Sequence, residues 1–78
     1  MPTIFRKEGY RFFFYANDHL PVHVHIEKES STAKFTIFPL ELIKSKGFKA
    51  HELSEIRKLV GENTATIEKS WYEYFGNQ

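Results

Sequence analysis

The chain contains no cysteine. Without thiols it can form no disulfide framework, no thiolate zinc site and no cysteine nucleophile. The absence of disulfides is typical of proteins in a reducing compartment, so we expect a cytoplasmic location. Long apolar runs are missing as well, and the first residues show no signal-peptide pattern. We therefore expect neither a membrane span nor a leader segment.

An excess of charge of one sign is also missing. The formal net charge is +1, and basic and acidic side chains are spread evenly over both halves of the chain. A dedicated binder of duplex DNA usually shows a clear basic excess. The charge therefore gives no argument for nucleic acid, although it leaves RNA open as a ligand.

Aromatic residues are abundant by contrast, with eight Phe, four Tyr and one Trp among 78 residues. A chain of this length predicts one domain over residues 1–78, which buries only about 60% of its unfolded surface. Large rings give so small a core much apolar area per side chain. Some rings can also lie at an interface with a protein partner or with a second copy of the chain.

The first half of the chain carries strand patterns. The segments that read as strands are Thr3–Arg6, Tyr10–Tyr15, Val22–Glu27 and Thr32–Phe38. They predict an antiparallel meander of three to four strands. Tyr10–Tyr15 is apolar on both faces, so we expect it to be covered on both sides or by a partner.

The next residues are ambiguous. Leu40–Lys44 fits a strand as well as a helical turn. The residues after it resemble a turn, and we expect Lys44, Lys46 and Lys49 to be solvated there.

From Lys49 onward the apolar period is helical. Gly61 interrupts the pattern and costs about 1 kcal/mol relative to Ala inside a helix. The apolar phase nevertheless continues across it, so we predict one C-terminal helix, kinked or split at Gly61, packed on one face of the sheet. The fold class is therefore α+β. The predicted core stripe is Leu53, Ile56, Val60, Ile67, Trp71 and Phe75.

Three of the four histidines fall within Asn17–His25. Side chains two apart on a strand share a face, so His23, His25 and Glu27 are expected on the side opposite Val22, Val24 and Ile26. Asp18 and His19 lie in the preceding turn. This stretch is the candidate site.

The histidine stretch has three interpretations. As a metal site, His23 and His25 would hold one divalent ion, with His19 or Asp18 completing the set. As a catalytic site without a metal or other cofactor, Asp18, His19, His23 and His25 would cleave RNA by acid–base chemistry. There, Asp18 would orient His19, and Arg11 and Lys34 would bind phosphate. The third interpretation is that the histidines are ordinary polar residues of an open sheet face.

The C-terminal segment adds a second candidate surface. Trp71 and Phe75 match the core stripe, whereas Tyr72 and Tyr74 fall outside it. Exposed tyrosines among apolar rings are typical of a protein-binding patch. Tyr72 and Tyr74 are therefore the candidate partner-binding residues.

Several motifs together resemble a family of small bacterial proteins, the DUF4160 family, along nearly the whole chain. Its hallmark is approximately Asp-His-x-Pro-Pro-His-x-His, and Val22 replaces the second Pro here. The matching segments are Met1–Ile4, Gly9–Arg11, Asp18–Pro21, His23–His25, Gly47–Lys49 and Trp71–Phe75.

The resemblance implies a bacterial or phage origin. It also implies a neighbour-encoded partner similar to the DUF2442 family, in an arrangement like a toxin–antitoxin pair. We therefore expect the protein to be the small component of a two-protein module. It would act through the face that carries Asp18, His19, His23, His25 and Glu27, and RNA is a candidate substrate. The alternatives are a non-catalytic protein-binding module and a small metal-binding protein.

Overall fold

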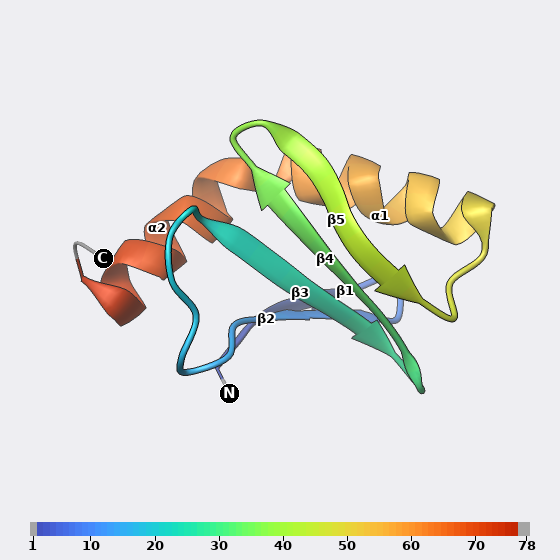
Figure 1. Ribbon diagram of the computed structural model, residues 1–78, viewed down its shortest axis with the longest axis horizontal. Coiled ribbons are helices and arrows are strands. Elements are labelled where there is room, and N and C mark those ends of the chain that lie inside the picture. The colour runs from blue at the N-terminus through green and yellow to red at the C-terminus, as the bar shows by residue number, and fades with distance from the viewer. Residues whose placement is uncertain (1, 77–78) are drawn as a thin grey trace.

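The computed structural model describes residues 2–76. It has an antiparallel sheet followed by two helices that lie across one face of the sheet (Figure 1). The predicted α+β class is therefore confirmed. The elements are β1 (Thr3–Lys7), β2 (Tyr10–Phe13), β3 (His23–Lys28), β4 (Ser31–Ile37), β5 (Leu40–Lys46), α1 (Ala50–Glu62) and α2 (Thr64–Phe75).

The sheet is a meander of five strands in the order β1-β2-β3-β4-β5. The predicted number of three to four was wrong, because residues 40–46 form a full strand. Leu42 pairs with Phe35 and Lys44 pairs with Lys34, which leaves Ile43 as an extra residue in a bulge. This bulge breaks the alternation of β5, which explains why the sequence pattern was ambiguous.

All three lysines of this region are exposed, as predicted, but only one of them lies in the turn. Lys44 and Lys46 belong to β5, and Lys49 is the N-cap residue of α1. The turn between β5 and α1 is limited to residues 47–49.

The core lies between the sheet and the helices. Four of the six residues in the predicted helical stripe are fully buried, and Leu53 and Phe75 pack against them in part. Leu59 is an additional buried residue on α1. The sheet and its flanking residues contribute Tyr10, Phe12, Phe14, Val22, Val24, Ile26, Ala33, Phe35 and Ile37 to this core.

The second face of β2 is covered within the chain. Phe13 points away from the core but is only 1% exposed. The guanidinium of Arg11 lies over its ring at 4.3 Å, and the rings of Tyr15 and His25 lie at 5.1 and 5.6 Å. Intramolecular side chains thus provide the cover that was predicted for this strand.

The helical segment is split into two helices, an alternative that the sequence left open, and the single continuous helix that the sequence favoured was wrong. The break falls at Asn63, two residues after Gly61. The side-chain amide of Asn63 donates to the carbonyl of Leu59 at 2.7 Å, while its backbone N–H donates to Val60. The side-chain amide of Asn63 thus takes the place of the Asn63 backbone N–H as the donor to the Leu59 carbonyl, and this exchange bends the helix.

Gly61 instead lies inside α1, where the helix passes close to β5. A Cβ atom at this position would lie 3.3 Å from Cδ2 of Leu40.

Among residues 2–76, neither helix is long and apolar enough to cross a membrane.

Candidate metal centre

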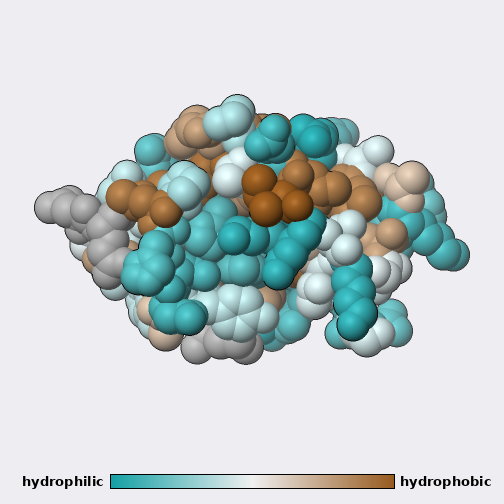
Figure 2. Space-filling model, in the orientation of Figure 1, coloured by the Kyte–Doolittle hydropathy of each residue, from teal (hydrophilic) through white to brown (hydrophobic). Residues whose placement is uncertain are grey.

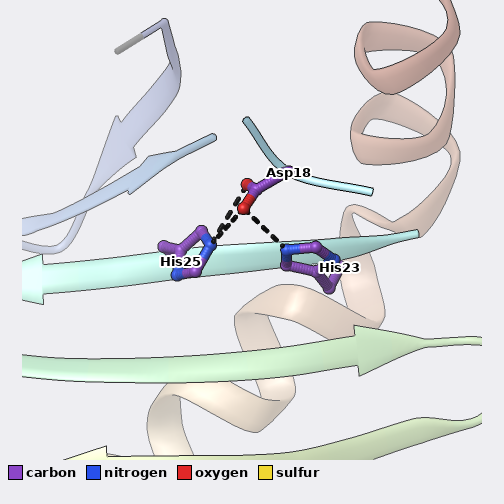
Figure 3. Close-up of side chains that lie close together, drawn as sticks. All are labelled: Asp18, His23 and His25. Carbon is purple, nitrogen blue, oxygen red and sulfur yellow. Dashed lines mark hydrogen bonds and ion pairs between the residues drawn. The ribbon is translucent and has the colours of Figure 1, made fainter. Parts of the chain in front are cut away.

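Three side chains with ligand atoms converge where the loop after β2 meets the first residues of β3. Asp18 comes from the loop, and His23 and His25 come from β3. The alternation of the strand brings both imidazoles to the same side. The carboxylate of Asp18 lies between the two rings (Figure 3). One ligand atom from each residue lies within 4.8 Å of the others.

Asp18 contacts both rings through their Nε2 atoms. Nε2 of His25 donates to the carboxylate at 3.1 Å (Oδ2) and 3.2 Å (Oδ1). Nε2 of His23 lies 3.2 Å from Oδ1. Two imidazole nitrogens therefore face one carboxylate.

The orientation and tautomer of His23 are set by the backbone. Its Nδ1 lies 2.9 Å from the carbonyl oxygen of Pro21, which can only accept a hydrogen bond. The proton of the neutral ring is therefore on Nδ1, and Nε2 carries a lone pair. This nitrogen is buried and has no hydrogen-bond partner within the described residues, because its contact with Asp18 lacks hydrogen-bond geometry.

Asp18 is held by a turn of the loop. Its backbone N–H donates to the carbonyl of Tyr15 at 3.1 Å, and the N–H of Tyr15 donates to Oδ2 of Asp18 at 2.9 Å. Burial acts to raise the pKa of Asp18, but the Tyr15 N–H and the imidazoles of His23 and His25 outweigh it. The pKa of Asp18 is consequently below its ordinary value, and the residue is a carboxylate at neutral pH.

His25 is packed more tightly than a surface histidine. Its ring meets the ring of Tyr15 edge-on, with centroids 4.6 Å apart, and lies beside Phe13. Burial lowers the pKa of His25, although the neighbouring Asp18 opposes the shift, and Lys34 lowers it further. The neutral imidazole, which is the metal-binding form, is therefore favoured.

The arrangement suits a divalent metal ion better than paired acid–base catalysis. Two imidazole nitrogens and one carboxylate are common ligands of Zn²⁺ and related ions. The bonds from His23 to Pro21 and from Tyr15 to Asp18 are the outer hydrogen bonds that orient metal ligands. A general acid and a general base would instead flank a substrate from two sides, whereas both Nε2 atoms here turn toward one point.

The other predicted site residues are dispersed. His19 is exposed and does not belong to the group, so Asp18 orients His23 and His25 instead. Arg11 donates to Glu27 at 2.7 Å and to Thr3 at 2.8 Å. Arg11, predicted to bind phosphate, and Glu27, predicted to lie beside the histidines, therefore bind each other.

The predicted phosphate and partner residues lie elsewhere on the surface. Lys34 lines a groove next to His25. Tyr72 and Tyr74 are 42% and 48% exposed on α2.

Sequence reasoning missed three neighbours of the centre. Tyr15 holds Asp18 and packs on His25, Pro21 fixes His23, and the indole of Trp71 lies 5.1 Å from the His23 ring. Pro21 and Tyr15 hold His23 and Asp18 through backbone groups, for which residue type gives no signal. Trp71 was assigned to the core alone.

The fold and the cluster define a small α+β domain with a two-histidine, one-carboxylate centre. A family described as a domain of unknown function, DUF4160, matches residues 9–72. The chain belongs to this family, and the matched region contains all three residues of the centre. No curated protein and no solved structure matches the chain.

Proposed function

We propose that this protein binds one divalent first-row transition-metal ion through Asp18, His23 and His25. The observation that carries the proposal is Nε2 of His23, which is buried, has no hydrogen-bond partner among residues 2–76 and lies 3.2 Å from a carboxylate oxygen of Asp18. In the neutral ring this nitrogen presents a lone pair to the carboxylate oxygen, which is unfavourable in a buried place. A proton on Nε2 or a metal ion between the two atoms would replace this repulsion with attraction.

The ligand set is nearly ready for an ion. His23 already has the required tautomer, and Asp18 is ionised. His25 must release the Nε2 proton that it now donates to Asp18, so metal binding is expected to release or relocate a proton. Imidazole and carboxylate ligands together favour Zn²⁺, Co²⁺, Ni²⁺ or Fe²⁺ over Ca²⁺ and Mg²⁺.

Three protein ligands leave one position of a tetrahedral ion open. Catalytic zinc sites have this pattern, whereas structural sites have four protein ligands. The side chain of His25 is 13% exposed and lines the neighbouring groove, so the groove lies next to the proposed ion. The centre therefore suits chemistry on a ligand as well as storage of an ion.

The test is isothermal titration calorimetry of tag-free protein with Zn²⁺. The wild type is expected to bind one ion, and Asp18→Asn and His25→Ala are expected to weaken binding at least about tenfold. His19→Ala and His51→Ala are matched controls, because both are exposed histidines outside the centre. A wild type that binds no zinc, or a His19→Ala variant that loses it equally, would overturn the proposal.

A protein-binding role is the second candidate, and the exposure of Tyr72 and Tyr74 supports it. Co-purification with an untagged neighbour-encoded protein tests this role, and Tyr72→Ala with Tyr74→Ala should abolish it. The toxin–antitoxin-like module and the bacterial origin stay predictions that rest on the family resemblance.

A further inference from the structure

One row of side chains crosses four strands on the face of the sheet away from the core. The register pairs Phe13 with His25, His25 with Lys34, and Lys34 with Lys44. Directly paired residues of an antiparallel sheet share a face. An aromatic ring, a histidine of the candidate metal centre and two lysines therefore stand side by side.

This row borders a groove of about 290 Å³, which we call the lysine groove. Among residues 2–76, its lining combines aromatic, hydroxyl and lysine side chains and includes no carboxylate. The face in Figure 2 is hydrophilic over the middle strands, with apolar side chains above them. The lining residues are Phe13, Tyr15, His25, Ile26, Thr32, Ala33, Lys34, Lys44, Ser45 and Lys46.

The charge in the lysine groove is one-sided although the whole chain is nearly neutral. Lys34 and Lys44 are direct partners across two strands, and Lys46 follows two residues later on β5. Like charges directly opposite each other destabilise a sheet. An anionic ligand would remove this cost, and phosphate groups are the anions that such a cluster of lysines fits.

The other side of the groove offers a ring. Tyr15 is 39% exposed, and its edge-on contact with His25 fixes the position of its ring. Lysines along a sheet face opposite an accessible aromatic ring are the combination that binds single strands, where phosphates meet cations and bases stack on rings. Acidic peptides and lipid headgroups would use the lysines but not the ring.

We infer that the lysine groove binds single-stranded nucleic acid, with phosphates against Lys44 and Lys46 and a base against Tyr15. The groove volume is near the lower limit of small-molecule sites, about 300 Å³, so it accommodates part of a strand at a time. His25 belongs to both the groove and the centre. A bound strand therefore passes beside the metal ligands.

The test is fluorescence anisotropy with labelled ten-nucleotide uridine and thymidine strands, in a buffer that contains EDTA. The chelator makes the result independent of the proposed metal function. Wild-type protein should bind at least one strand, and the affinity should fall steeply with salt, by about 0.7 in log units per log unit of salt for each phosphate contact.

Matched variants locate the binding site. Lys44→Ala with Lys46→Ala should weaken binding roughly tenfold and reduce the salt slope. Lys58→Ala with Lys69→Ala removes the same charge from exposed positions on the helices and should leave binding unchanged. Tyr15→Leu should weaken binding roughly fivefold or more, whereas Tyr15→Phe retains the ring and should preserve it.

Three results would overturn the inference. The first is no salt-dependent binding of either strand by folded wild-type protein. The second is an equal loss of affinity in the Lys58/Lys69 control. The third is full competition by uridine monophosphate at the same concentration as the strand, which would indicate a pocket for a free nucleotide. Zinc titration of the Lys44/Lys46 variant separates this inference from the metal proposal, because its metal affinity should be unchanged.

Discussion

The imidazole of His23 packs edge-on against the indole of Trp71, with ring centroids 5.1 Å apart. Trp71 is the single tryptophan of the chain and is fully buried in the core. One proposed metal ligand is thus part of the contact between β3 and α2. The centre is therefore supported by the core rather than by the loop alone.

This contact makes Trp71 a reporter of metal binding. Open-shell ions such as Co²⁺ quench indole emission at short range, so Co²⁺ should reduce the fluorescence of the wild type in a saturable manner. Zn²⁺ should compete with Co²⁺ and restore the emission. Asp18→Asn should abolish the saturable phase, and His19→Ala should retain it. Quenching that is identical in wild type and Asp18→Asn would mean that Co²⁺ acts from another place.

Metal binding is also expected to stabilise the fold. An ion present at 100 times its dissociation constant stabilises the folded state by about 2.7 kcal/mol. For a domain of this size, the melting temperature should rise by roughly 10 °C or more. Differential scanning calorimetry with Zn²⁺, then with excess EDTA, measures the rise and its reversal. A similar rise in His25→Ala would contradict the assignment of this ligand.

Alkaline pH should weaken the fold through Tyr10. Burial raises the pKa of Tyr10 to about 12, and its hydrogen bond to Glu55 at 2.7 Å contributes. The folded state therefore keeps a proton that the unfolded chain releases near pH 10. The resulting stability is complete below pH 10 and is lost as the pH rises toward 12.

Urea unfolding at pH 8 and pH 11 measures this effect. Tyr10→Phe should cost about 1 kcal/mol at pH 8 through the lost hydrogen bond. It should then lose less stability than the wild type between the two pH values. Tyr74→Phe is the exposed control and should follow the wild type. Equal alkaline losses in wild type and Tyr10→Phe would exclude Tyr10 as the cause.

Two glycines should respond differently to substitution by alanine. Gly47 has a φ of +91°, and an added Cβ would lie 2.5 Å from Oγ and 3.3 Å from Cα of Ser31. Gly47→Ala should therefore lower the free energy of unfolding by about 2 kcal/mol or more. Gly61 is helical, and its Cβ would meet only the flexible end of Leu40. Gly61→Ala should stay within about 1 kcal/mol of the wild type, because improved helix propensity offsets the contact. Denaturant titration compares them, and equal losses would contradict this account.

Part of the site was predictable from the strand pattern. Strict alternation from Val22 to Glu27 placed His23 and His25 on one side, and the structure shows their rings meeting one carboxylate. The sequence offered Asp18 and His19 as candidates for the third group, and alternation could not decide between them. The choice depends on the turn between Tyr15 and Asp18, in which the backbone N–H of Asp18 donates to Tyr15 and the N–H of Tyr15 donates to the Asp18 carboxylate.

The errors in the fold also have local causes. The bulge at Ile43 obscured β5, and with it the position of Lys44 beside Lys34. The side chain of Asn63 ends α1 by taking the carbonyl of Leu59. The break was predicted at Gly61 because glycine weakens helices. In the structure, the missing side chain of Gly61 instead allows a close approach to Leu40. Both features depend on contacts that sequence periodicity does not record.

The most direct test of the central claim is a crystal structure of the protein grown with Zn²⁺, with an anomalous difference map at the zinc edge. The account predicts one ion bound by Nε2 of His23, Nε2 of His25 and a carboxylate oxygen of Asp18, with zinc–ligand distances of about 2.0–2.2 Å. An ion bound only at His19 or His51, with the three proposed ligands in unchanged mutual contact, would contradict it.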